Sequence, residues 1–160
     1  MSHHFEATVT WTGNQGTGTS TYRAYSRNYE VVGEGKSAMI PGSSAPAFRG
    51  DKSRYNPEDL IIASLSACHM LWVLHLCAEA QITVVEYVDT ASGTMVLNQD
   101  GSGQFSEVVL RPRITVMETG READIAAINE RANHLCFIAR SVNFPVKHEA
   151  VVTVRGGIYD

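Results

Sequence analysis

The sequence predicts an α+β fold with a mainly antiparallel sheet and two long helices, the first of them buried centrally. Segments that alternate apolar and polar residues occur at both ends and in the middle of the chain, as in strands with one face in a core. Between them lie two segments with helix-start signals or helical spacing, at 57–80 and 122–141. Strand pairs separated by helices in this order are typical of α+β domains.

The N-terminal third is predicted to form a β-hairpin followed by a long loop. Residues 5–11 (FEATVTW) alternate, and residues 21–32 (TYRAYSRNYEVV) are rich in aromatic and β-branched residues. The Gly/Thr-rich segment 13–20 would turn the chain between these strands. Residues 41–55 (PGSSAPAFRGDKSRY) show little periodicity, and so long a loop in a compact domain is more often functional than not.

The first helix has the strongest start signals in the chain. Asn56 is a good N-cap, Pro57 suits the first helical position, and the acidic pair 58–59 complements the helix dipole. The helix is predicted to run to about Ala80. Its apolar segment has roughly the 20 residues that cross a bilayer. The segment also carries the polar residues Ser64, Ser66, His69, His75 and Glu79. We therefore expect a buried helix and no membrane partner.

The second half of the chain is predicted to hold two long strands, a helix and a final strand. Residues 84–96 and 105–117 would pair in antiparallel fashion around the turn 98–103 (NQDGSG). The helix 122–141 places Ile125, Ile128 and Leu135 on its apolar side, and 146–155 closes the chain as a strand. No repeat or composition shift divides the chain, so one domain spanning 1–160 is expected.

Composition excludes several classes of function. The formal charge is -4 and no basic stripe appears, which argues against a nucleic-acid partner. The first residues (MSHHFEATVTW) are polar and alternating, unlike a signal peptide. An odd number of cysteines (Cys68, Cys77 and Cys136) without a secretory signal favours a reducing, cytoplasmic location, with a redox or structural role for the thiols.

Two of the cysteines lie in helical patterns and close to histidines. Cys68 follows Asn56-Pro57-Glu58 in the run NPEDLIIASLSACHM, and Cys136 lies in HLCFIARS, near the end of the second helical pattern. Helical spacing places Cys68 on one face with Leu71, Trp72, His75 and Glu79. Cys77 is nine positions further, about 180° around the helix, and is predicted to fill the core.

A reactive Cys68 would need a cation nearby, because mid-helix amides are already paired and the thiolate is the nucleophile. Arginine is the natural choice, since it stays charged. Two alternatives compete with this chemistry. His69 could raise the thiolate fraction of Cys68 or simply fill a polar gap in the core. Four side chains could also bind zinc: Cys68, His75, His134 and Cys136. Their spacing matches no standard zinc site, so we expect no metal and no cofactor.

The run NPEDLIIASLSACHM resembles the Asn-Pro-Glu…Ala-Cys signature of the OsmC/Ohr family, the thiol-dependent organic hydroperoxide reductases. The second cysteine, 68 residues later in HLCFIARSVNFPV, fits the same pattern. Two positions depart from the family: Phe137 stands where its best-known branches have proline, and His69 where a bulky apolar residue is common. The coarse order of elements agrees over nearly the whole chain.

The resemblance implies an intertwined homodimer with two sites at the subunit interface and a peroxidase mechanism. Cys68 resembles the peroxidatic cysteine, Cys136 the resolving cysteine, and Glu58 the glutamate that pairs with an activating arginine. For that arginine, its spacing from the glutamate in the family favours Arg27 over Arg49. The implied substrates are organic hydroperoxides, and the implied reductant is a dithiol such as a lipoylated protein. An apolar pocket for the substrate is expected, lined by Met70, Trp72, Phe137 and Phe144.

The position of Glu58 poses a geometric question. Ten residues of continuous helix separate it from Cys68, which corresponds to about 15 Å. Either the helix starts later and Glu58 folds back, or Glu58 acts across the dimer, and we favour the second. The alternative function for the same fold is a redox-sensing or ligand-binding protein with little turnover.

Overall fold

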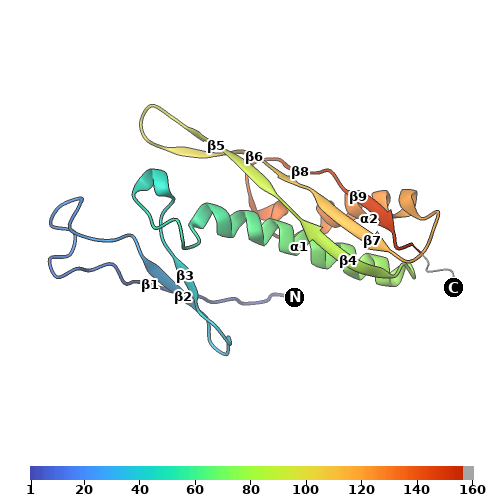
Figure 1. Ribbon diagram of the computed structural model, residues 1–160, viewed down its shortest axis with the longest axis horizontal. Coiled ribbons are helices and arrows are strands. Elements are labelled where there is room, and N and C mark those ends of the chain that lie inside the picture. The colour runs from blue at the N-terminus through green and yellow to red at the C-terminus, as the bar shows by residue number, and fades with distance from the viewer. Residues whose placement is uncertain (157–160) are drawn as a thin grey trace. The chain divides into compact units, whose positions relative to one another are not determined.

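The structure is a computed structural model that describes residues 1–156. It divides into two compact units, residues 1–61 and the residues from 62 onward. Helix α1 (Pro57–Glu79) begins in the first unit and supplies the core of the second (Figure 1). Each unit is described separately below.

The first unit is built on a three-stranded antiparallel sheet in the order β1-β2-β3. Its strands are β1 (Thr8–Trp11), β2 (Tyr29–Val32) and β3 (Ile40–Gly42), and a short 3-10 turn, η1 (Pro46–Phe48), follows. The predicted hairpin is therefore confirmed, with Thr8 opposite Val32.

The second predicted strand was too long at its N-terminal end. Residues 21–28 do not form a strand, because the guanidinium of Arg27 donates hydrogen bonds to the carbonyl oxygens of Tyr22 and Tyr25, at 2.8 Å each. These carbonyls are thus satisfied by a side chain instead of a neighbouring strand. The aromatic residues that suggested a strand pack around that arginine instead.

Helix α1 begins where the sequence predicts. Asn56 and Asp59 form a reciprocal cap: the Asp59 amide donates to Asn56 Oδ1 at 2.8 Å, and the Asn56 amide donates to Asp59 Oδ2 at 3.3 Å. Two amides at the start of the helix are satisfied in this way. The helix ends at Glu79, and Gln81 adopts a left-handed conformation just beyond it, with φ of 57°. Of the described residues, α1 is the one helix long and apolar enough to cross a membrane by length and composition alone.

The second unit contains two three-stranded sheets, in the orders β4-β7-β9 and β5-β6-β8. The predicted strand 84–96 is split into β4 (Val84–Asp89) and β5 (Ser92–Leu97), and 105–117 corresponds to β6 (Gly103–Leu110) and β7 (Pro112–Val116). Asp89 lies at the break, where its carboxylate accepts hydrogen bonds from the Arg111 amide and the Ser66 hydroxyl. The expected antiparallel pairing holds for β4 with β7 and for β5 with β6.

The final strand is also divided, into β8 (Val146–His148) and β9 (Val151–Val154). These strands pair in parallel with β6 and β7, so the sheets are rich in antiparallel pairs without being wholly antiparallel. Helix α2 (Glu122–Leu135) ends six residues before the predicted boundary at Ser141, because Cys136 leaves the helical region with ψ of 112°. A 3-10 turn, η2 (Ala139–Ser141), follows it.

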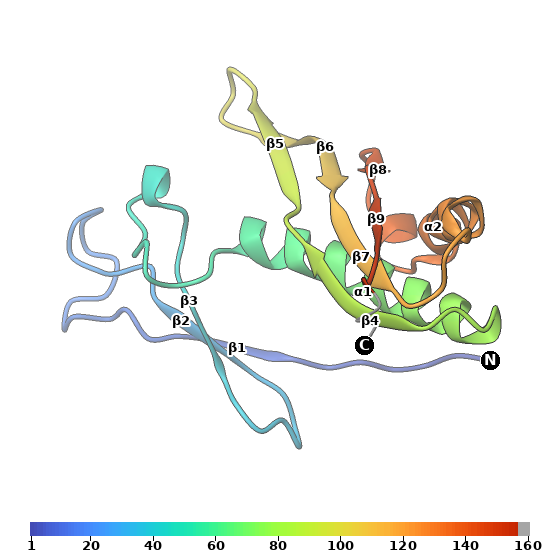
Figure 2. The same cartoon turned by 45° about the vertical axis from the view of Figure 1, so that its right-hand side comes forward.

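The core of the second unit forms where α1 and α2 meet the β4-β7-β9 sheet, as Figure 2 also shows. Its fully buried members include Val73 on α1, Ile114 on β7 and Ile125 on α2. At about 25 cal/mol per Å² of apolar surface removed from water, each such side chain contributes about 1.5–3 kcal/mol. This packing fixes α1, which carries Cys68, and α2, which ends immediately before Cys136.

Candidate functional site

A cavity of about 330 Å³ opens beside Cys68 in the second unit. Helical spacing brings residues 68, 71, 72 and 75 to one face of α1, as predicted. Phe137 lies on the segment that follows α2 and contributes the fifth lining side chain. The lining residues are Cys68, Leu71, Trp72, His75 and Phe137. The wall is almost entirely apolar, and none of these five residues is lysine or arginine.

The aromatic side chains of this pocket contact one another edge to face. The Trp72 ring meets the Phe137 ring at a centroid distance of 5.7 Å, and the His75 imidazole meets Trp72 at 5.7 Å on the other side. His75 also lies 3.4 Å from the Glu79 carboxylate, and both are exposed. Such edge-to-face contacts hold the rings in defined orientations. The pocket therefore has a shaped apolar wall with a polar histidine–glutamate pair beside it.

Cys136 lies close enough to Cys68 for the two free thiols to interact electrostatically. Cys68 is half-buried, whereas Cys136 is 1% exposed. Burial raises the pKa of Cys136 to about 11, the neighbouring Cys68 adds to this rise, and the Ala139 amide, 3.4 Å from the Cys136 sulfur, opposes it. The structure thus pairs an accessible thiol with a buried one that stays protonated at neutral pH.

The third cysteine takes no part in this pair. Cys77 is 1% exposed and belongs to the hydrophobic core of α1, β7 and α2. Burial raises its pKa, so it is an inert thiol. The prediction that Cys77 fills the core is confirmed.

His69 points away from the solvent into a buried polar cluster. Its ring is fully buried, its Nε2 lies 3.1 Å from Asn129 Oδ1 on α2, and the ring stacks on His148 with centroids 5.4 Å apart. Burial lowers the pKa of His69, which favours the neutral imidazole. A neutral ring supplies no positive charge to a thiolate, so of the two alternatives the polar gap in the core is the one observed.

In the first unit, Arg27 is held rigidly by four groups. Besides its two hydrogen bonds to backbone carbonyls, its guanidinium carbon lies 4.4 Å from the centre of the Tyr22 ring and 4.0 Å from that of Tyr25. Trp11 meets Tyr25 edge to face and completes this aromatic cluster. Such contacts keep an arginine charged and oriented at little entropic cost.

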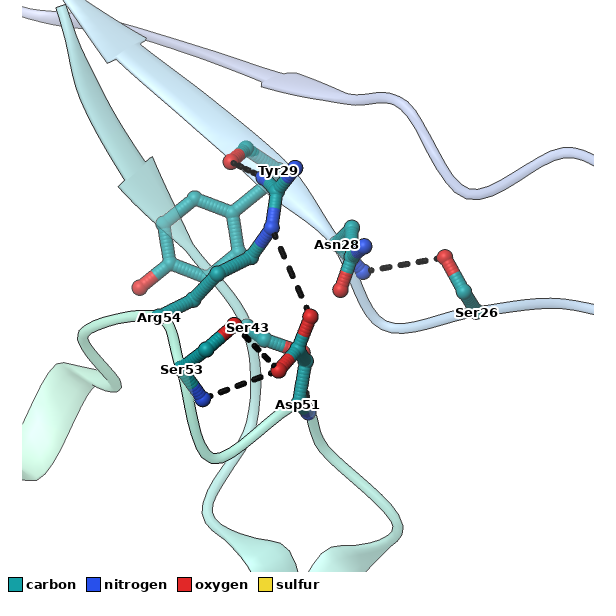
Figure 3. Close-up of polar contacts among 7 residues, drawn as sticks. All are labelled: Ser26, Asn28, Tyr29, Ser43, Asp51, Ser53 and Arg54. Atoms are coloured by element: carbon teal, nitrogen blue, oxygen red, sulfur yellow. Dashed lines mark hydrogen bonds and ion pairs between the residues drawn. The ribbon is translucent and has the colours of Figure 1, made fainter.

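The other two arginines of this unit are placed differently. Arg49 follows η1 in a left-handed conformation, with φ of 63°, and its guanidinium carbon lies 5.7 Å from the centre of the Tyr22 ring. Arg54 lies 3.9 Å from Asp51 and donates to the Tyr29 carbonyl oxygen at 3.5 Å (Figure 3). Arg27 and Arg49 thus share one tyrosine, whereas Arg54 is part of a separate network.

That network orders the loop of residues 41–55. The Asp51 carboxylate accepts hydrogen bonds from the amide and the hydroxyl of Ser53, at 2.8 and 2.6 Å (Figure 3). The Asp51 amide donates to the hydroxyl of the fully buried Ser43 at 3.0 Å. The loop that was expected to be functional is therefore a defined structure that carries Arg49 and Arg54.

Glu58 is the second residue of α1, so the alternative in which the helix starts later is wrong. Its Oε2 is buried without a hydrogen-bond partner among the described residues. The Glu58 charge helps to raise the pKa of Tyr29, for which burial is the larger cause. Glu58 is therefore a carboxylate with unused bonding capacity, separated from Cys68 by ten residues of continuous helix.

Among residues 1–156, no group of three histidine, cysteine or carboxylate side chains has a spacing suited to a metal ion. Of the four side chains considered as zinc ligands, Cys68 and His75 line the pocket, Cys136 is buried, and His134 is exposed near the end of α2. Arg27, Arg49 and Glu58 belong to the first unit, and both cysteines to the second. Their joint action remains a prediction.

The fold and the cysteine pair define an α+β protein with a dithiol site beside an apolar pocket. The chain belongs to the OsmC-like protein family, whose model matches residues 50–151. This family includes peroxide-resistance proteins. The α+β fold predicted from the sequence, with antiparallel-rich sheets and two helices, is confirmed.

Solved structures show the same fold. An OsmC-like protein of unknown function from Vibrio cholerae is 30% identical, with a TM-score of 0.83, covering 94% of this chain and 100% of that one. An organic hydroperoxide resistance protein from Elizabethkingia anophelis is 20% identical, with a TM-score of 0.66, covering 97% of this chain and 100% of its own. A comparison with curated proteins finds no match.

The roles of Asn129 and His148, which contact His69, were not predicted from the sequence. Asn129 is 1% exposed and occupies the apolar side of α2, four residues after Ile125. A polar amide at an apolar helical position signals a buried hydrogen bond, and this signal was available in the sequence. His148 carried no comparable signal, because its contact with His69 depends on how β8 pairs with β6.

Proposed function

We propose that this protein is a thiol-dependent peroxidase that reduces organic hydroperoxides to alcohols. The observation that supports this most directly is the half-buried Cys68, which lines an apolar pocket and has a second, buried thiol as its neighbour. An apolar pocket suits the organic part of a hydroperoxide, and a neighbouring thiol suits a reaction that ends in a disulfide. Family membership is consistent with this proposal.

In the first step the Cys68 thiolate attacks the terminal peroxide oxygen. The sulfur–oxygen bond forms as the O–O bond breaks, the peroxide is reduced, and the alkoxide leaves as the alcohol after taking up a proton. Cys68 becomes a sulfenic acid. The pocket rings of Trp72 and Phe137 would contact the organic group during this step.

In the second step the Cys136 sulfur attacks the sulfenic sulfur of Cys68. A disulfide forms, and the sulfenic oxygen leaves as water with the proton of the Cys136 thiol. An external dithiol, such as a lipoyl group on a protein partner, then reduces the disulfide and is itself oxidised. A cytoplasmic location would keep this reductant available.

Arg27 is our first candidate for the cation that stabilises the Cys68 thiolate, and Arg49 is the second. The two carbonyls and two rings that hold Arg27 favour it, because an oriented charge loses less entropy than a mobile one. Glu58 would orient the arginine, and its unpartnered oxygen is free to accept a guanidinium hydrogen bond. We propose that Glu58 acts on Cys68 of a second copy of the chain.

A homodimer also agrees with the exposed apolar side chains of the single chain. Leu71 is 62% exposed and Phe137 is 69% exposed, and both line the pocket of Cys68. Burying such side chains would stabilise a dimer by the transfer of apolar surface from water. A second copy would thus cover the pocket and supply the charged groups that its own walls lack.

The test is steady-state reduction of cumene hydroperoxide by the purified chain with dihydrolipoamide. We expect Cys68→Ser to abolish turnover, Cys136→Ser to accumulate a sulfenic acid that dimedone traps, and the matched control Cys77→Ser to keep its activity. Full turnover by Cys68→Ser would overturn the proposal. Disulfide formation with negligible turnover would instead favour the redox-sensing alternative.

A further inference from the structure

A buried polar bridge joins α1, which carries Cys68, to α2, which ends one residue before Cys136. His69 on α1 and Asn129 on α2 meet through Nε2 and Oδ1 at 3.1 Å, and both residues are buried to 1% exposure or less. His69 directly follows Cys68. Asn129 precedes Cys136 by seven residues, which is about two helical turns.

The hydrogen bonds around Asn129 define the state of the histidine. Asn129 Nδ2 donates to the Ile125 carbonyl oxygen at 2.9 Å, so its Oδ1 faces His69 as an acceptor. His69 Nε2 must therefore carry a proton and donate it, whereas its buried Nδ1 has no partner among the described residues. A neutral ring leaves only a lone pair unmatched at Nδ1, but a charged ring would bury an unpaired N–H.

A second layer supports this bridge. The His148 ring, from β8, stacks on His69 with an interplanar angle of 28°. His148 Nε2 lies 3.4 Å from the exposed carboxylate of Glu130, one residue after Asn129 on α2. The stack therefore fixes the plane of the His69 ring, and with it the direction of the N–H that reaches Asn129.

We propose that the His69–Asn129 hydrogen bond is the device that holds Cys68 and Cys136 in register for disulfide formation. This inference rests on the proposed function, because it concerns its second step. It assigns His69 and Asn129 as positioning residues: neither touches the peroxide, and each acts through the element that carries a cysteine.

The reason that register matters is competition for the sulfenic acid. Disulfide formation requires the two Cα atoms within about 7 Å and a defined torsion about the sulfur–sulfur bond. If Cys136 is displaced, a second hydroperoxide oxidises the Cys68 sulfenic acid to sulfinic acid and is itself reduced to the alcohol. A misplacement of about 1 Å can slow an oriented reaction by roughly a hundredfold.

The experiment measures this partition. The reduced protein is mixed with cumene hydroperoxide, and mass spectrometry gives the ratio of Cys68–Cys136 disulfide to Cys68 sulfinic acid. We expect His69→Leu and Asn129→Ala to lower this ratio roughly tenfold or more, with the rate of the first peroxide reaction unchanged. His69→Gln retains an N–H donor and should restore most of the ratio.

The variant Val73→Ala distinguishes a positioning role of His69 from a general effect of destabilising α1. Val73 lies one turn after His69 on the same buried face of α1 and is fully buried, but it has an apolar side chain. We expect this variant to lose stability and keep the wild-type ratio. A ratio that falls equally in Val73→Ala, or that stays unchanged in His69→Leu, would overturn the inference.

The wild type supplies a measurement that does not depend on whether the variants fold. As pH falls, protonation of His69 would bury an unpaired Nδ1–H, with His148 and Asp89 as the neighbouring titratable groups; this should destabilise the packing around the bridge and lower the ratio, while His69→Gln keeps a flatter profile. Identical profiles would count against the inference. A wild type that forms no disulfide at any pH would instead refute the proposed function.

Discussion

The rings of Trp72 and Phe137 meet edge to face in the wall of the Cys68 pocket, with centroids 5.7 Å apart and planes 77° apart. Phe137 directly follows Cys136, at a position where the best-known branches of the family have proline. A ring there extends the apolar wall beside Cys68, so Phe137 links the pocket to Cys136, the neighbouring residue in the chain. This contact makes Phe137 a residue that should select among hydroperoxides.

We expect Phe137→Ala to weaken the reaction with bulky aromatic hydroperoxides. The variant loses the ring that would contact the aromatic group of the substrate, and an aromatic pair is worth about 0.5–1.5 kcal/mol beyond burial. That corresponds to a roughly twofold to tenfold lower kcat/KM for cumene hydroperoxide. Hydrogen peroxide, which is too small to contact the ring, should react as with the wild type. Leu97→Ala, which truncates an exposed side chain of β5, is the control; an equal loss with both peroxides would contradict this role.

The pH dependence of disulfide formation should follow the ionisation of the Cys136 thiol. Its pKa is raised to about 11, mainly by burial, so only a small fraction is thiolate at neutral pH. A group below its pKa gains thiolate tenfold per pH unit, and the rate of the second step should therefore rise about tenfold per unit from pH 7 towards pH 10. Stopped-flow tryptophan fluorescence after a single peroxide addition would report it. A rate that levels off near pH 8 would show that Cys136 ionises far more easily than burial allows.

The three thiols should differ strongly in reactivity towards alkylation. Cys68 is half-buried at the pocket, whereas Cys77 and Cys136 are each 1% exposed and have raised pKa values. We expect iodoacetamide to label Cys68 alone in the native, reduced protein, and all three thiols after unfolding. Peptide mapping would assign the sites. Native labelling of Cys77 at the rate of Cys68 would be incompatible with its place in the core.

The sequence was most informative where local signals act over a few residues. The cap formed by Asn56 and Asp59 placed the start of α1, and the spacing of Cys68, Leu71, Trp72 and His75 placed one pocket wall. These features depend on backbone geometry within one helix, so they can be derived without knowledge of the rest of the fold.

The predictions from the sequence were wrong where a group distant along the chain decides the secondary structure. Residues 21–28 read as a strand, yet the guanidinium of Arg27 bonds to their carbonyls. The break between β4 and β5 depends on Asp89, which receives hydrogen bonds from Ser66 and Arg111, far away along the chain. Likewise, the parallel pairing of β8 and β9 follows from the tertiary fold and leaves no trace in the local alternation.

The stability of the fold should fall on acidification in a way that depends on His69. Burial is the main cause of its lowered pKa, followed by the repulsion of His148, while the hydrogen bond to Asn129 Oδ1 and the charge of Asp89 oppose the shift. Because the folded-state pKa lies below the 6.5 of an exposed imidazole, the unfolded chain takes up the proton first as pH falls. The contribution of His69 is thus fully present above pH 6.5 and is lost as pH falls towards the folded-state pKa.

The comparison of wild type with His69→Gln isolates this contribution. Glutamine can keep a donor for Asn129 but cannot titrate, while His148 and Glu130 are present in both proteins. Urea unfolding at pH 8 and pH 5 should therefore show the wild type losing more free energy of unfolding than the variant between the two pH values. An equal loss in both proteins would mean that folding does not lower the pKa of His69, and that the buried ring is not the group whose protonation destabilises the fold in acid.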